Sequence, residues 1–208
     1  MKNILIHGLG QNSKDWDTIK NELETRGISS VAPDLFDLAK GRKLDYPTVY
    51  QAFSELCESY QDKLNLCGLF LGGLLALNYA IQYPKKINSL VLIGTPFEIP
   101  KGLLKFQNIV FRFMPKAVFQ NMGVSKKDFI RLSKSMVDLN FMDSATALDC
   151  PALILCGAKD KTNMESAKRF HEAMKNSKLV IVEASGHEVN KDNPNELVRV
   201  LQDFWADR

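Results

Sequence analysis

Short apolar runs alternate with segments of helical periodicity along most of the chain, and this alternation limits the fold more than any other feature. The runs are rich in Val, Leu and Ile, and they cover residues 3–7, 28–32, 63–68, 87–94, 152–157 and 179–184. Near-continuous apolar strands joined by helices are typical of a parallel sheet covered on both faces. The sequence therefore predicts an α/β fold with a mainly parallel sheet of about six strands.

The segments between these runs place apolar residues at the three- and four-residue spacing of a helix. The predicted helices cover residues 15–26, 46–60, 70–82, 164–175 and 193–206. A chain of 208 residues can bury one substantial core, and no repeat or Pro/Gly/Ser-rich linker divides it. We therefore expect a single domain over residues 1–208.

Residues 97–150 break the alternation, because they contain no convincing strand. A structureless loop of that length is uncommon in a compact domain, so we interpret the segment as a helical cap insertion over the strand ends. Its stretch 102–120 interleaves aromatic residues with Lys and Arg. Three roles fit this pattern: a packed cap helix, a membrane-surface helix, or one wall of an acyl pocket lined by Phe106, Phe111 and Phe113.

Composition excludes several classes of function. The formal net charge is only +3 and no block of like charge occurs, so we expect no nucleic-acid partner. No apolar run approaches the ~20 residues of a membrane span, and the first residues enter a strand without a signal-peptide core. We expect a cytoplasmic protein with no stable membrane insertion, no cofactor and no metal; the oligomeric state is not predicted. The four cysteines form no CxxC pair and are expected to be reduced thiols.

Residues that could carry chemistry come directly after four of the predicted strands. The segment 7–11 (HGLGQ) follows the first strand and the segment 68–73 (GLFLGG) follows the third. Asp160 follows the fifth strand, and His187 follows the sixth. Ligands of parallel α/β sheets bind outside the carboxyl ends of the strands, so these residues are expected to meet at one edge of the sheet.

This set resembles the α/β-hydrolase fold family, in particular its compact bacterial esterase-like and lipase-like members, over nearly the whole chain. In that family a G-x-S-x-G turn between strand and helix, the nucleophile elbow, holds the serine, and the acid and then the histidine follow. The resemblance implies that residues 68–72 form the elbow, that Asp160 is the acid and that His187 is the base. It also implies that the backbone N–H groups of Leu9 and Leu71 form the oxyanion hole.

The elbow departs from the family pattern at its apex, because it reads GLFLG and Phe70 stands where the serine is expected. A phenyl ring cannot act as nucleophile, acid or base. The apex residue of an elbow normally has a positive φ, which is unusual for a bulky residue. We expect Phe70 to adopt this φ, with its ring filling the pocket or lying beneath the insertion. No other serine has glycines two residues before and two after it.

Asp160 and His187 each have a simpler interpretation when taken alone. An Asp in a loop is commonly a cap or turn residue, and a His beside a glycine is commonly a hydrogen-bonded surface residue. Their joint occurrence at two family positions in the expected order favours a catalytic pair. His7 is expected to be structural and His171 to be a solvated surface residue.

Three functions remain open at this point. The first is a carboxylesterase-like hydrolase that works by Ser-His-Asp acyl transfer in its serine form; the chain as written lacks the nucleophile and should be inactive or nearly so. A single base change converts a Ser codon into a Phe codon, so a point variant of an intact enzyme is one explanation. The second is a non-catalytic protein that binds a small molecule or partner in the same pocket. The third uses His187 as a general base without covalent catalysis.

The apolar residues around the expected site indicate a substrate class. Leu9, Leu69 and Leu71 carry no charge, and no Lys or Arg stands at a strand end to pair with an anion. We therefore expect the small-molecule acyl substrate of the serine form to be an uncharged ester with a short-to-medium acyl chain.

Overall fold

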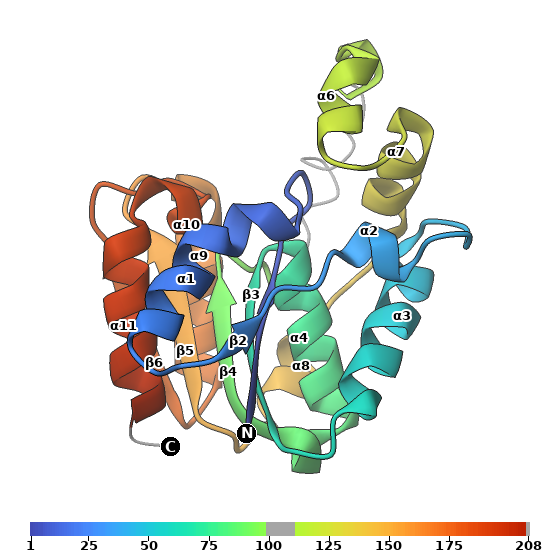
Figure 1. The fold of residues 1–208 in the computed structure, drawn as a ribbon. Coiled ribbons are helices and arrows are strands. Elements are labelled where there is room, and N and C mark those ends of the chain that lie inside the picture. Colours follow the sequence, from blue (N-terminus) through green and yellow to red (C-terminus); the bar gives the residue numbers. More distant parts are fainter. Residues whose placement is uncertain (99–110, 207–208) are drawn as a thin grey trace.

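The computed structural model describes residues 1–98 and 111–206, which form a six-stranded sheet with helices on both faces (Figure 1). The strands are arranged in the order β2-β1-β3-β4-β5-β6, and every neighbouring pair is parallel. The predicted α/β fold with about six strands is confirmed. The strands are β1 (Lys2–Ile6), β2 (Ser30–Val31), β3 (Leu64–Leu69), β4 (Ile87–Ile93), β5 (Ala152–Gly157) and β6 (Ser177–Val182).

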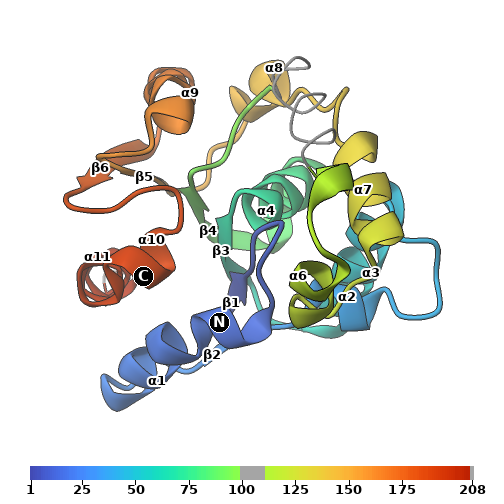
Figure 2. The ribbon, with the colours of Figure 1, turned by 90° about the horizontal axis from the view of Figure 1, so that it is seen from above.

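Alternate residues of the central strands point to opposite faces of the sheet and build two separate cores. In β1, Ile4 and Ile6 pack into one core and Leu5 into the other. The first core lies under α3 (Tyr46–Ser59), α4 (Leu71–Gln82) and α9 (Lys161–Ala173), and the second lies under α1 (Asp17–Thr25) and α11 (Pro194–Ala206) (Figure 2). Because both faces are covered, the strands are apolar almost throughout, as the sequence predicted.

Shorter helices complete the described part of the chain. They are α2 (Leu35–Leu38), α6 (Lys116–Asn121), α7 (Lys126–Ser135), α8 (Met142–Ala145), α10 (Val189–Asp192) and the 3₁₀ turns η1 (Ser13–Trp16) and η2 (Pro84–Lys86). Within residues 1–98 and 111–206, none of the helices has both the length and the apolar character needed to cross a bilayer.

The segment between β4 and β5 is helical in its described part. Helices α6 and α7 stand beyond the carboxyl ends of the strands, whereas α8 contacts α4 and α9 (Figure 1). The stretch 102–120 is not one continuous helix, because Pro115 is extended (φ −59°, ψ 144°) and α6 begins after it. We refer to α6 and α7 together as the cap helices.

The strand order brings the chemistry-bearing segments together. The chain passes from β1 to β2 on one side of β1 and then to β3 on its other side, so the order reverses between β1 and β3. Ile6 and Gly68 are register partners, and the segments 7–11 and 68–73 therefore leave the sheet side by side. Such a reversal point is where open α/β sheets form a binding crevice.

Candidate active site

Phe70 lies at the apex of the turn between β3 and α4. Its backbone angles are φ +45° and ψ −103°, so the residue has the positive φ that the elbow requires. Its N–H donates to the carbonyl of Ile93, and its own carbonyl accepts from Leu74 N–H, both at 2.9 Å. A non-glycine residue in such a conformation costs about 1–3 kcal/mol and persists only when its surroundings fix it.

The two glycines that flank Phe70 hold the elbow in this shape. A Cβ on Gly68 would lie 2.2 Å from the carbonyl carbon of Gly72, and a Cβ on Gly72 would lie 2.2 Å from the carbonyl oxygen of Ile6. Real Cβ atoms do not approach backbone this closely, so only glycine permits the packing of α4 against β1 and β3. The elbow geometry thus depends on these glycines and not on the side chain at its apex.

The Phe70 ring lies against the imidazole of His187. The two rings meet edge to face, with their centroids 5.4 Å apart and an interplanar angle of 74°. The ring is partly buried and also packs on both apolar cores. It therefore occupies the space beside His187 where the resemblance expects a nucleophile.

Asp160 and His187 form a hydrogen-bonded pair. Asp160 Oδ2 lies 2.8 Å from His187 Nδ1, with the Asp160 side chain 5% exposed and the His187 side chain 39% exposed. Asp160 precedes α9 and His187 lies in the loop after β6. A carboxylate can only accept, so the Nδ1 atom carries the proton and Nε2 is left free to take one.

Gly94, directly after β4, makes room for this pair. It has φ +50°, and a Cβ at this position would lie 3.0 Å from His187 Nδ1 and 3.3 Å from Asp160 Oδ2. A side chain here would press on both partners of the hydrogen bond. Gly94 was not predicted as a site residue, although its place at a strand end was a usable signal.

Asn163 is a further polar neighbour of Asp160 that the sequence analysis missed. Its Nδ2 lies 3.0 Å from Asp160 Oδ1 and 2.8 Å from Oδ2, and its backbone N–H donates to Oδ1 at 3.2 Å. Burial by itself would raise the pKa of Asp160, but the hydrogen bonds from His187 and Asn163 outweigh it and the pKa is lowered. Asp160 is therefore held as a carboxylate.

The expected oxyanion-hole groups lie on the neighbouring loops. Leu9 belongs to the turn after β1, where Gly10 has φ +97°, and Leu71 is the first residue of α4. In the described part of the chain, neither N–H donates a hydrogen bond. Both donors are thus available at the carboxyl edge, on either side of the β1–β3 reversal point.

His7 has a structural environment, as expected. It is fully buried, its Nε2 accepts from Leu35 N–H at 3.0 Å, and its Nδ1 therefore donates to the carbonyl of Gly8 at 3.0 Å. Burial lowers the pKa of His7, which favours the neutral ring. Its contacts fix the start of the segment 7–11 to the turn before α2.

A buried polar cluster joins the loop of Leu9 to the loop of His187. Gln11 Nε2 donates to Glu188 Oε1 at 2.8 Å and to Asn190 Oδ1 at 3.1 Å, and Asn190 Nδ2 donates to the carbonyl of Asp15 at 3.0 Å. Lys191 adds ion pairs to Asp15 and Glu188. Sequence spacing gave no sign of these contacts, because the partners lie at opposite ends of the chain.

Among the described aromatic residues of the insertion, neither Phe111 nor Phe113 makes a ring contact with Phe70 or His187. Phe106 lies outside the described residues. The Phe111 ring packs on Phe129 of α7 with centroids 5.0 Å apart, and Phe113 is 85% exposed. The extended Pro115 separates these residues from α6, and their place in an acyl pocket stays a prediction.

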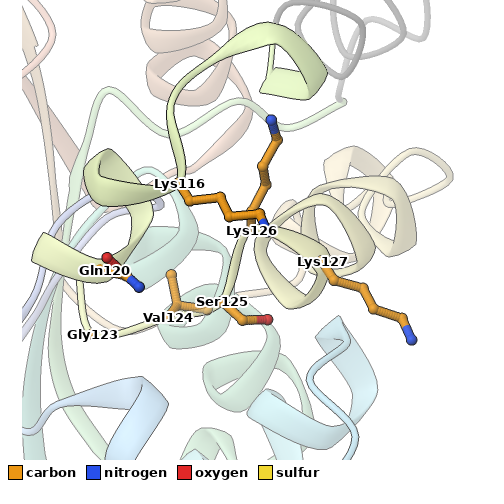
Figure 3. A pocket seen from close by; sticks show the side chains of 7 residues that line it. All are labelled: Lys116, Gln120, Gly123, Val124, Ser125, Lys126 and Lys127. Atoms are coloured by element: carbon orange, nitrogen blue, oxygen red, sulfur yellow. The ribbon is translucent and has the colours of Figure 1, made fainter.

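The cap helices form a depression of about 580 Å³ of their own (Figure 3). Its lining is basic and polar, but Lys126 is already engaged, because its Nζ donates to the carbonyls of Arg112 and Met114. Neither Phe70 nor His187 lines it, so it is separate from the site at the sheet edge. The lining residues are Lys116, Gln120, Gly123, Val124, Ser125, Lys126 and Lys127.

The cysteines give no alternative nucleophile among the described residues. Cys67 is fully buried in β3, and burial raises the pKa of its thiol far above the usual range. Burial also raises the pKa of Cys156 to about 12 and that of Cys150 to about 11. All four are free thiols that stay protonated near neutral pH.

Comparison with known proteins agrees with this architecture. Lipase 3 of Moraxella sp. is 26% identical over 93% of this chain and 75% of its own length. A carboxylesterase structure from Nitrososphaera gargenis superposes with a TM-score of 0.86 at 18% identity, covering 99% of this chain and 90% of that one. An esterase of Thermogutta terrifontis superposes with a TM-score of 0.82 at 18% identity, covering 100% and 90%.

A family model described as the alpha/beta hydrolase fold matches residues 4–139. This match covers β1 to β4 and the elbow, whereas Asp160 and His187 lie beyond it. More than half of the chain is matched, and the sheet order and the elbow agree with it. The chain belongs to the α/β-hydrolase fold family.

Proposed function

We propose that this chain carries the site of a serine-type carboxylic ester hydrolase in which Phe70 occupies the position of the nucleophile. The observation that carries the proposal is the 2.8 Å hydrogen bond from His187 Nδ1 to Asp160 Oδ2, with the apex of a positive-φ elbow directly beside the imidazole. Acid, base and elbow are the parts that acyl transfer needs, and the hydroxyl is the part that is missing.

In the serine form, the residues would divide the reaction as follows. The hydroxyl at position 70 attacks the acyl carbon, and His187 Nε2 takes its proton. Asp160 keeps the other ring nitrogen protonated and stabilises the imidazolium that forms. The N–H groups of Leu9 and Leu71 donate to the oxyanion of the tetrahedral intermediate. His187 then returns the proton to the leaving alcohol, and water repeats the sequence to release the acid.

The chain as written should have almost no esterase activity. Loss of the nucleophile alone lowers kcat by about 10⁶-fold in a triad enzyme, and the remaining groups retain about 10³-fold over water. The residues next to the site, Leu9, Leu69 and Leu71, are apolar, and neither Asp160 nor His187 pairs with a Lys or Arg among the described residues. These features support an uncharged ester with a short-to-medium acyl chain as the substrate.

The test compares four proteins on p-nitrophenyl esters of increasing acyl length: the chain as written and three variants. Phe70→Ser should turn over, whereas Phe70→Ala, which removes the ring but supplies no hydroxyl, should stay at the level of the chain as written. Adding His187→Ala to Phe70→Ser should remove the gain. The proposal fails if Phe70→Ser and Phe70→Ala are equally inactive, or if the unchanged chain is fully active through another residue.

The contact between Phe70 and His187 supports a second candidate, a non-catalytic binding protein. The apolar ring packs on the imidazole with the ring centroids 5.4 Å apart, so it could offer a bound ligand an apolar contact in place of a nucleophile. This candidate predicts that the chain as written binds short-chain ester or carboxylic acid probes in calorimetry and that Phe70→Ser weakens the binding without giving turnover. Absence of binding by the unchanged chain would remove this candidate.

A further inference from the structure

Asp160 has two structural roles, and these leave the orientation of its carboxylate to be fixed by a further contact. Asp160 is the N-cap of α9, where its Oδ1 accepts from Asn163 N–H at 3.2 Å, and it is also the acceptor of His187 Nδ1 through Oδ2. A carboxylate held through one oxygen can still turn about that hydrogen bond. The cap contact alone therefore does not fix the direction in which Oδ2 points.

The side-chain amide of Asn163 supplies the missing second anchor. Its Nδ2 lies within 3.0 Å of Oδ1 and 2.8 Å of Oδ2, so it spans both oxygens of the same carboxylate. Asn163 is 7% exposed and Asp160 is 6% exposed, so water does not compete freely for these contacts. With the backbone N–H, the amide determines the plane of the carboxylate independently of His187.

The orientation of the amide follows from the charges around it. Turning the Asn163 side chain over would place its carbonyl oxygen against a carboxylate, so the NH₂ group must face Asp160. The same Nδ2 lies 3.2 Å from His187 Nδ1. Since Nδ1 donates its proton to Asp160, Asn163 Nδ2 and His187 Nδ1 are both donors to Asp160 Oδ2. Their short separation follows from this shared acceptor.

We infer that Asn163 is a positioning residue, whose amide holds Asp160 Oδ2 toward His187 and thereby selects the Nδ1-protonated ring. The inference rests on the proposed function only where catalysis is concerned, because the state of the His187 ring exists with or without turnover. Other charged groups near the His187 loop are already engaged: Glu188 with Gln11 and Lys191, and Asp192 with Gly186 N–H. Within the described residues, Asp160 is the carboxylate that meets the ring itself.

Two substitutions separate a hydrogen-bond donor from a space-filling residue. Asn163→Leu keeps roughly the volume of the side chain but supplies no donor, whereas Asn163→Ala removes both the amide and the volume. Neither variant places a new charge beside Asp160 or His187. If Asn163 only fills space, Asn163→Leu should be the milder change; if it acts as a donor, both substitutions should perturb His187 to a similar extent.

The first measurement needs no catalysis. Nitrogen NMR shifts of His187 at neutral pH report which ring nitrogen carries the proton. The unchanged chain should show Nδ1–H, and both Asn163→Ala and Asn163→Leu should show a mixture of the two tautomers. Unchanged Nδ1–H in both variants would overturn the inference.

The second measurement uses the Phe70→Ser chain. Asn163→Ala should lower kcat by about 10- to 100-fold at nearly constant KM, because a misplaced base slows the chemical step. In the Asp160→Asn background, the same substitution should have no further effect. An equal loss in that background would show that Asn163 does not act through Asp160. If Phe70→Ser gives no turnover, the proposed function fails. The NMR measurement still tests whether Asn163 determines the tautomer of His187.

Discussion

The two sides of this site differ in what holds them. On the acid–base side, Asp160 and His187 are fixed by side-chain hydrogen bonds of 2.8–3.2 Å, including those from Asn163. On the nucleophile side, the elbow around Phe70 is fixed by backbone contacts and by glycines that tolerate no Cβ. The first side also contains a crowded glycine, Gly157, whose Cβ would lie 2.1 Å from the Gly186 carbonyl oxygen, but the contact between Asp160 and His187 depends on the chemistry of their side chains. The second keeps its shape with a phenyl ring at its apex, because its shape never depended on that side chain.

The largest expected effect lies on the acid–base side. Adding Asp160→Asn to Phe70→Ser should lower kcat by about 10⁴-fold, because the amide no longer holds His187 in the required tautomer. Steady-state kinetics on p-nitrophenyl esters measure this, with circular dichroism to verify folding. A loss below tenfold would mean that the hydrogen bond between Asp160 and His187 is not used in catalysis.

On the nucleophile side, the free energy of unfolding should respond most strongly to a substitution that adds a Cβ close to the backbone. Gly72→Ala forces a Cβ to within 2.2 Å of the Ile6 carbonyl oxygen and should lower the free energy of unfolding by at least about 3 kcal/mol. Gly186→Ala, on the acid–base side, is the matched control, because its Cβ would meet nothing closer than 3.3 Å. Urea titrations of both variants compare the two sides directly. Equal destabilisation would contradict the difference between them.

A smaller effect isolates the backbone strain at the elbow apex. Phe70→Gly and Phe70→Ala both remove the ring, but only glycine adopts φ +45° without strain. The glycine variant should therefore be more stable to unfolding by about 1 kcal/mol. The same pair at Ala76, inside α4, should give the opposite order, because glycine weakens a helix interior. A more stable Phe70→Ala would show that the elbow relaxes once the ring is lost.

The smallest effect concerns pH and His7. Burial holds the folded-state pKa of His7 below its ordinary value of 6.5, so the unfolded chain binds a proton that the folded chain resists. The free energy of unfolding should thus fall as the pH drops below about 6.5, by at most about 1.4 kcal/mol per pH unit for this one group. His7→Gln should flatten this slope in urea titrations between pH 7 and pH 5. An unchanged slope would assign it to other groups.

The sequence predicted the parts of the fold and the site that depend on local pattern. Strand and helix periodicity located the six strands, and the strand ends led to Phe70, Asp160 and His187. The role of Asn163 was missed, although an Asn three residues after an acid at a helix start is a readable signal. Contacts between Gln11 and Asn190 carry no such signal, because they join loops 179 residues apart. Aromatic spacing also gave no sign that an extended Pro115 separates Phe111 and Phe113 from α6.

The double use of Asp160 ties the site to the local stability of one helix. Fraying of the first turn of α9 would break the cap hydrogen bond from Asn163 N–H and release the carboxylate that faces His187 at the same moment. The two losses are therefore one cooperative opening event and not two. Amide hydrogen exchange at Asn163 consequently reports the fraction of molecules in which the acid and the base are out of contact. The opening rate of that single turn therefore sets an upper limit on the lifetime of the assembled site.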